Sequence, residues 1–349
     1  MLRLLSFIAV VGLAAAVSAA GPCEERLTPE KLEKLPVPAF LRTRDVSWVD
    51  PQRLAFATSK GIQLRPASGG SVQRLPADIQ EVIRVASDGK TLVASNFDYT
   101  DVAVDVRSGK MTHHRRRYAM SIRDIAVAGP KVGILGFPVR VEGVDFGNVW
   151  TGPLGAAWEK YTLLEPAGTD KEMDYLRLSF PLYSGAVAMA ADGTTFAVTH
   201  GKPGVARYVP DGRRAAALGR GLTELVVRNL PETTTKYGKD PLSHYTEILN
   251  RQPFADDLVL LPEGPAIVVR QFARGTIWWE LWFPNETKTR RRVRLMIDQK
   301  QIAGGHLRCD ARGTKLACVF GKLVALGQPE QPHLALFDLK SVKRSAACK

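Results

Sequence analysis

Short runs of apolar residues separated by tight turns recur along this chain, and residues 85–94 show the pattern most clearly. Two apolar runs flank the turn residues Asp88 and Gly89, which predicts two short antiparallel strands joined by a hairpin. Weaker copies of this pattern, some with Pro in the turn, centre on Pro51, Gly129, Gly193, Gly264 and Gly313. Apolar residues occupy both faces of these strands, so we expect the strands to be buried on both sides.

A second, more polar pair of strands follows each hairpin. Residues 102–112 and 334–344 share an apolar residue, an Asp, an aliphatic residue, a base and then a Ser. Six such units, each with a buried inner pair and a polar outer pair, predict an all-β, six-bladed β-propeller of four-stranded antiparallel blades. The alternative is a tandem pair of β-sandwiches, which also contain short strands with regular turns.

The motifs ASDGKTLVAS and VDVRSGK resemble the blades of the TolB-like branch of the propeller superfamily, which use similar Asp-Gly hairpins followed by a Ser-Gly turn. The resemblance covers about residues 45–343 as an architecture. It implies a fold and no particular activity, because one propeller fold serves many functions. The units around Pro51, Gly129 and Gly264 depart from it, since Pro-containing turns replace the Asp-Gly turn.

The N-terminal residues 1–20 differ from the rest of the chain. A basic residue, Arg3, precedes an apolar run over residues 4–17 and then small residues, which predicts a cleaved secretory signal peptide. We therefore expect a secreted or periplasmic protein, with a lead-in over residues 21–44 and one propeller domain over residues 45–349. No other stretch reaches the length of a membrane span.

Four cysteines follow the predicted signal peptide, and an even number in an exported protein indicates two disulfides. Cys309 and Cys318 flank one hairpin turn, so we expect them to pair with each other. That pairing leaves Cys23, near the mature start, to bond Cys348, next to the end.

The chain carries 48 basic and 35 acidic residues, a net charge of +13. A basic exported protein attracts anionic ligands and polymers. Nucleic-acid-binding signatures are absent, so we expect no nucleic-acid partner. We also expect the protein to be a monomer. Arginine runs such as residues 290–292 fall on predicted outermost strands, where charge keeps sheet edges from pairing with one another.

Wide spacing between turns predicts two inserts. Gly129, Gly193 and Gly264 lie 64 and 71 residues apart, whereas a blade takes about 40 residues. The extra residues fall near 159–183 and 221–253, and both inserts leave the same face of a propeller. We expect that face to bind a protein partner or a small anionic ligand through Asp98, Tyr99, Arg270, Arg274, Tyr237, His244 and Tyr245.

Acidic residues open most of the predicted first strands, at the propeller axis. The residues at these positions are Asp45, Glu81, Asp124, Ser184, Asp257 and His306. Clustered carboxylates hold a divalent cation such as calcium or raise one another's pKa, so the four acids with His306 form a candidate metal site. The competing explanation is that each acid caps its own strand.

The predicted function is an exported binding or assembly module without a cofactor and without identifiable catalytic residues. The alternative is a metal-dependent, lactonase-like hydrolase that uses the axial carboxylates.

Overall fold

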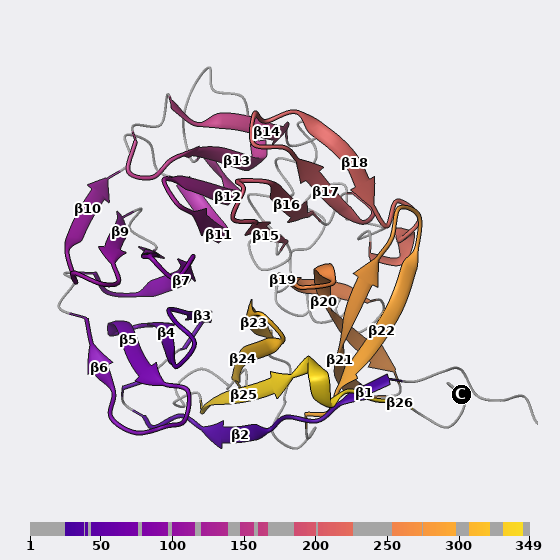
Figure 1. Ribbon diagram of the computed structural model, residues 1–349, viewed down its shortest axis with the longest axis horizontal. Helices are drawn as coiled ribbons and strands as arrows, with labels where there is room; N and C mark the ends of the chain where they lie inside the picture. Colours follow the sequence, from indigo (N-terminus) through magenta and orange to yellow (C-terminus); the bar gives the residue numbers. More distant parts are fainter. Residues whose placement is uncertain are drawn as a thin grey trace, which may run out of the picture.

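Six antiparallel sheets stand around a central axis in the computed structural model (Figure 1). The structure describes residues 25–37, 39–40, 43–75, 79–96, 100–115, 120–138, 147–156, 160–166, 185–199, 202–225, 253–273, 275–297, 307–321 and 331–344. The predicted six-bladed propeller with four-stranded antiparallel blades is confirmed, and the tandem-sandwich alternative is excluded.

The first three blades follow the chain in order. Blade 1 contains β3 (Asp45–Trp48), β4 (Arg53–Thr58), β5 (Gly61–Pro66) and β6 (Gln73–Arg74). Blade 2 contains β7 (Val82–Ser87), β8 (Thr91–Asn96), β9 (Thr100–Asp105) and β10 (Met111–Arg115). Blade 3 contains β11 (Met120–Ala128), β12 (Lys131–Pro138), β13 (Gly147–Pro153) and β14 (Thr162–Pro166). Strand β14 lies inside the first predicted insert, so the third blade extends further along the chain than the repeat pattern indicated.

The next two blades also begin with consecutive strands. Blade 4 contains β15 (Ala186–Met189), β16 (Thr195–Val198), β17 (Val205–Tyr208) and β18 (Arg214–Leu218), followed by a short 3-10 helix, η2 (Thr223–Leu225). Blade 5 begins with β19 (Phe254–Leu261), β20 (Gly264–Ala273), β21 (Thr276–Pro284) and β22 (Thr289–Leu295).

Blade 6 is completed by the N-terminal end of the chain. Its first three strands are β23 (Arg308–Arg312), β24 (Lys315–Gly321) and β25 (Pro332–Asp338), and its fourth is β2 (Lys31–Lys34), which pairs antiparallel with β25. This pairing closes the ring, as the indigo strand beside the yellow one shows in Figure 1. Residues 21–44, expected to precede the propeller, therefore supply part of it.

A second N-terminal strand extends blade 5. Strand β1 (Glu25–Leu27) runs parallel to β22, and β26 (Lys343–Arg344), which follows the 3-10 helix η5 (Leu339–Ser341), pairs antiparallel with β1. Strand β1 thus covers the edge of β22 only at Val293, Arg294 and Leu295, next to the arginine run 290–292 for which we predicted an outermost edge. The predicted signal peptide, Cys23 and Cys348 lie outside the described residues.

The blades pack through apolar layers, and the layer between blades 5 and 6 contains several large aromatic side chains. Trp279 and Phe283 of blade 5 meet Phe320 and Phe337 of blade 6 there, all at most 2% exposed. Burying each such side chain contributes about 1.5–3 kcal/mol relative to leaving it in water. Trp282 of blade 5 is buried as well and packs against blade 4.

The strand order gives the propeller two different faces. Hairpins between first and second strands lie on one face, here called the turn face. Connections between blades, and between second and third strands, lie on the opposite loop face, where the first strands begin. No helix in the described ranges is long and apolar enough to cross a membrane.

Candidate functional site at the propeller axis

Charged side chains alternate around the axis where the innermost strands begin. Equivalent positions in blades 1 to 6 are occupied by Asp45, Arg84, Asp124, Ala186, Asp257 and Arg308, and we call this set the axial ring. Acids thus occupy the odd-numbered blades, and arginines occupy two of the three even-numbered blades. Blade 4 breaks the alternation with Ala186.

Each aspartate of the axial ring joins two neighbouring blades. Asp45 accepts hydrogen bonds from the N–H of Val46 in its own blade and of Val85 in blade 2, both at 3.0 Å. Asp257 does the same with Leu258 at 2.8 Å and with Cys309 of blade 6 at 2.7 Å. An innermost strand has one edge without a neighbouring strand, so its N–H groups need other acceptors. The carboxylates supply them.

Asp124 repeats this arrangement between blades 3 and 4. It accepts hydrogen bonds from the N–H of Ile125 and from the N–H of Val187, the latter at 2.7 Å. A fourth inter-blade aspartate, Asp310, accepts from the Ser47 hydroxyl at 2.8 Å and from the Trp48 N–H at 2.7 Å. These hydrogen bonds explain why acids stand at the starts of the innermost strands. Each acid accepts from the backbone of its own strand or of a neighbouring blade, and the ring aspartates also converge at the axis.

Single-residue bulges set the ring positions in blades 2, 3 and 5. In blade 2, Val82 pairs with Asn96 but Arg84 pairs with Ser95, which leaves Ile83 as the extra residue. In blade 3 the extra residue of the bulge is Arg123, directly before Asp124, and in blade 5 it is Asp256, directly before Asp257. A bulge re-aims the side chains beside it, so it directs the charged residues toward the axis.

Burial dominates the electrostatics of the ring. Burial, with a smaller contribution from Asp124, raises the pKa of Asp45 to about 7, although Arg84 and Arg308 act in the opposite direction. Burial likewise raises the pKa of Asp257 well above its ordinary value. Removing a carboxylate from water favours its neutral form, and only close positive charge offsets that effect.

The two arginines of the ring supply that positive charge. Arg308 lies 3.7 Å from Asp257, and Arg84 lies 3.7 Å from Asp124. Burial lowers the pKa of Arg84 to about 10, with Arg308 as the next cause. For Arg308, burial also acts to lower the pKa, but the ring aspartates outweigh it and the pKa is raised. Arginine stays charged at these values, so Arg84 and Arg308 remain positive beside aspartates whose ionised forms burial disfavours.

The axial ring brings together three of the five residues predicted to bind a metal: Asp45, Asp124 and Asp257. Glu81 lies outside the ring, where its side chain is 44% exposed and lies 3.9 Å from Arg44. His306, like Ser184, lies outside the described residues. Within the described ranges no three His, Cys, Asp or Glu side chains are arranged to hold a metal ion. Arg84 and Arg308 lie beside these acids and contribute the positive charge that a bound cation would otherwise supply.

A cavity of about 390 Å³ extends along the axis from the ring toward the turn face. The ring aspartates line its inner end, and Asp88, Asp310 and Arg312 line its end at the turn face. Between these ends its wall is mostly aliphatic, with residues such as Ile125 and Leu258.

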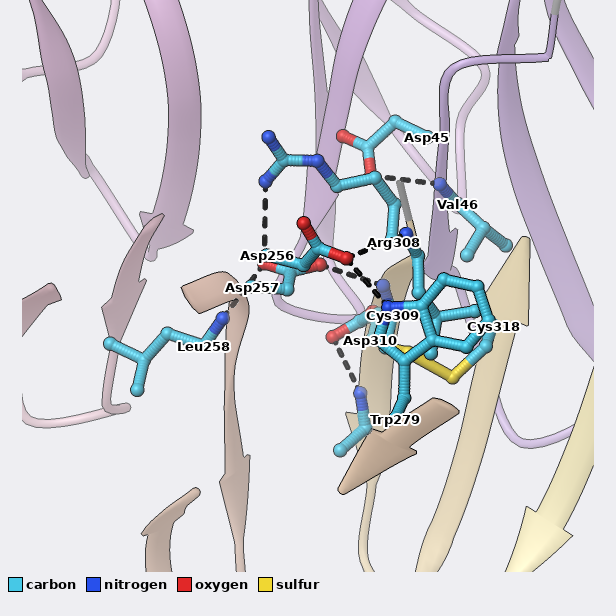
Figure 2. The surroundings of a disulfide bond; sticks show 12 residues. Asp45, Val46, Asp256, Asp257, Leu258, Trp279, Arg308, Cys309, Asp310 and Cys318 are labelled. Atoms are coloured by element: carbon cyan, nitrogen blue, oxygen red, sulfur yellow. Dashed lines mark hydrogen bonds and ion pairs between the residues drawn. A yellow bond between two sulfur atoms is a disulfide. The ribbon is translucent and has the colours of Figure 1, made fainter. Parts of the chain in front are cut away.

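A disulfide anchors blade 6 next to the ring. Cys309 and Cys318 are directly opposite each other in β23 and β24 and are bonded, as the hairpin predicted. Figure 2 shows this bond beside Trp279, whose indole N–H donates to Asp256 at 2.6 Å. Asp256 also accepts from the N–H of Leu307 at 3.2 Å, so the bulge residue joins blades 5 and 6.

One predicted binding residue, Arg270, is described and lies at the loop-face end of β20. It is directly opposite Phe254 on one side and Trp279 on the other. The residue is 2% exposed, and its Nε and Nη1 atoms have no hydrogen-bond acceptor in the part of the chain that the structure describes. The other predicted binding residues, Asp98, Tyr99, Arg274, Tyr237, His244 and Tyr245, lie outside the described residues.

Comparisons with known proteins return propellers and no sequence family. No family model matches the chain, and no curated protein matches it. The structure of streptogramin B lyase is similar over 88% of this chain and 97% of that one, at 10% identity and a TM-score of 0.47. The β-propeller domain of Myceliophteria thermophila Cps50 (Swd1) is similar over 90% and 99%, at 11% identity and a TM-score of 0.44. Likenesses this distant concern the fold alone.

Proposed function

We propose that this chain is an exported, TolB-like binding module that takes an anionic group, a carboxylate or a phosphate, at Arg270 on its loop face. The observation that carries the proposal is the burial of a guanidinium two of whose nitrogens have no acceptor among the described residues. An unsatisfied buried charge destabilises a protein by several kcal/mol, so a ligand that satisfies it gains the energy that the free protein lacks. Arginine suits such a ligand, because its planar donors bind both oxygens of a carboxylate or phosphate.

The surroundings of Arg270 favour an ordered ligand site over a merely strained core position. The register places Arg270 between Phe254 and Trp279, two fully buried aromatic residues that hold the guanidinium stem. Asp256 lies in the same blade and already accepts from Trp279 and Leu307. The site also lies on the face where the inter-blade connections leave the propeller, which is where propellers acquire binding functions.

A thermal-shift experiment tests this proposal with inorganic phosphate and succinate as probes at constant ionic strength. We expect both anions to raise the Tm of the wild-type protein and not that of Arg270→Gln. Without anion, Arg270→Gln should unfold at the same temperature as wild type or a higher one, because it removes an unsatisfied charge.

Arg213→Gln is the matched control, since that arginine is 81% exposed in its side chain and already bonds Asp211. It should keep the full response to both anions. An equal response in Arg270→Gln would show that the anions act elsewhere. Strong destabilisation of Arg270→Gln, with no response in wild type, would show that Arg270 is structural.

A further inference from the structure

A second cavity lies on the opposite face of the propeller, where the ring closes between blades 6 and 1. This groove has a volume of about 720 Å³, in the range of small-molecule sites. It is bordered by the first hairpin of blade 1, the end of β5, and the turn-face ends of β24 and β25. The N-terminal segment that closes the ring contributes Lys31 to its rim.

The back of the groove is apolar, and one of its lining residues carries a buried hydrogen-bond donor without an acceptor among the described residues. Pro51, Pro66 and Leu336 line it together with Trp48, whose side chain packs in the layer between blades 6 and 1. Trp48 is 3% exposed, and its indole N–H has no acceptor among the described residues. Buried indole N–H groups normally have an acceptor, so this one indicates a place for a ligand oxygen.

The rim of the groove carries three cations, of which two are already engaged. Lys31 lies 3.1 Å from Glu33, and Arg53 lies 2.6 Å from Asp50. Lys315 lines the groove and forms no close ion pair with any residue that the structure describes, although it lies opposite Asp338 in the strand pairing and helps to lower the pKa of that carboxyl. The one acid in the lining, Glu30, is exposed at the rim.

We infer that the groove binds a small organic acid that consists of a flat apolar ring system and one carboxylate. The ring system packs against Pro51, Pro66 and Leu336. The carboxylate accepts the Trp48 indole N–H and is attracted by Lys315. A neutral ring compound gains nothing from the positive charge of Lys315, and an acid without a ring leaves the apolar wall exposed to water. The groove therefore favours a ligand that has both an apolar ring system and a carboxylate.

The test uses 2-naphthoate as the probe and 2-naphthamide as its neutral counterpart, with isothermal titration calorimetry on the full mature chain. We expect one 2-naphthoate per chain with a sub-millimolar Kd, and binding of 2-naphthamide about tenfold weaker. Lys315→Gln and Trp48→Phe should each weaken 2-naphthoate binding about tenfold, because each removes one interaction with the carboxylate. Glu30→Gln should tighten binding, since it removes a like charge from the rim.

Lys340→Gln is the control for a general loss of positive charge, because Lys340 lies in blade 6 outside the groove. It should leave the affinity unchanged. Arg270→Gln should also leave it unchanged, so this site and the loop-face site fail or succeed separately. Absence of binding at millimolar 2-naphthoate would overturn the inference, as would equal affinity in wild type and Lys315→Gln. The comparison of wild type with Lys315→Gln tests the inference even if Trp48→Phe folds poorly. Lys315 is exposed on the surface, so its replacement should not disturb folding.

Discussion

Two clusters of charge connect distant parts of this propeller, and they differ in how exposed their arginine side chains are. The axial ring joins the innermost strands, and its aspartates are 5–7% exposed. The other cluster, here called the peripheral clasp, joins β1 to the outer strand of blade 5 and to β26. In it Glu25 accepts hydrogen bonds from Arg291 and from Arg344, whose side chain is 66% exposed.

Because Glu25 is itself only 6% exposed, the difference shows that the partners of a buried carboxylate, and not its burial alone, decide what a charged contact does for stability. In the axial ring, burial raises the pKa of Asp45, Asp124 and Asp257, so their ionised forms are disfavoured in the folded protein. In the clasp, burial alone would lower the pKa of Arg291, but its hydrogen bonds to Glu25 and Glu263 outweigh it and the pKa is raised. The ring therefore orders the blades at an electrostatic cost, while in the clasp the hydrogen bonds of Arg291 outweigh the cost of burying it.

The largest predicted effect concerns covalent closure at the clasp. Glu25 pairs directly with Arg344. Cys23 precedes Glu25 by two residues and Cys348 follows Arg344 by four, which favours the predicted disulfide between them. A bond closing a loop of nearly the whole chain stabilises the folded state by about 5 kcal/mol in the chain-entropy model. Replacing both cysteines by serine should lower the free energy of unfolding in urea by that amount.

Peptide mapping under non-reducing conditions checks the pairing itself. The expected peptide links Cys23 to Cys348, and a separate one links Cys309 to Cys318. A peptide linking Cys23 to Cys309 would contradict both pairings, including the bond between β23 and β24.

Local patterns predicted the parts of this fold that depend on neighbouring residues. Hairpins such as residues 85–94 join strands close in sequence, so turn chemistry and apolar alternation were enough to find them. The closing strands β1 and β2 are short, and their partners lie some 270 to 300 residues away in the chain. No local pattern encodes such pairing, and the N-terminal segment was therefore predicted only as a lead-in.

The axial ring was predicted in part because three of its members are acids at strand starts. Its arginines were missed because the strands were aligned on acidic and polar residues, which selected Glu81 in blade 2 and His306 in blade 6. The shared signal is a charged residue directly before an aliphatic residue or Cys, as in Asp45-Val46, Arg84-Val85 and Arg308-Cys309. The bulges hide this signal, since one extra residue changes the apparent start of a strand.

The second prediction compares one arginine from each cluster. Arg308→Met leaves the ring aspartates with less positive charge in a buried site, so it should lower the free energy of unfolding by about 3–5 kcal/mol at pH 7.5. Arg344→Met removes an exposed partner of Glu25 and should cost about 1 kcal/mol or less. Urea unfolding of both variants at one pH provides the measurement. Similar losses in the two would remove the distinction between ring and clasp.

The third prediction uses pH to isolate Asp45. The pKa of Asp45 is about 7 in the folded protein, whereas its ordinary value is 3.8. Between pH 3.8 and pH 7 the folded state therefore binds more protons than the unfolded state. The stability that Asp45 contributes is complete below pH 3.8 and is lost as the pH rises through 7. Asp310, whose pKa burial raises to about 6, acts in the same direction. His333, whose pKa burial lowers, acts in the opposite direction below pH 6.5.

Because these groups act together, the measured quantity is the difference between wild type and Asp45→Asn. Between pH 5.5 and pH 8.0 the wild-type protein should lose about 2 kcal/mol of unfolding free energy that Asp45→Asn does not lose. At pH 5.5 the variant should be the less stable protein, since an amide cannot accept from both Val46 and Val85 as a carboxyl group does. At pH 8.0 the difference in unfolding free energy between wild type and Asp45→Asn should be smaller by about 2 kcal/mol. The loss of unfolding free energy in Arg344→Met should be the same at pH 5.5 and pH 8.0. A constant gap between wild type and Asp45→Asn would mean that Arg84 and Arg308 keep Asp45 ionised throughout, and that the axial ring is as well compensated as the clasp.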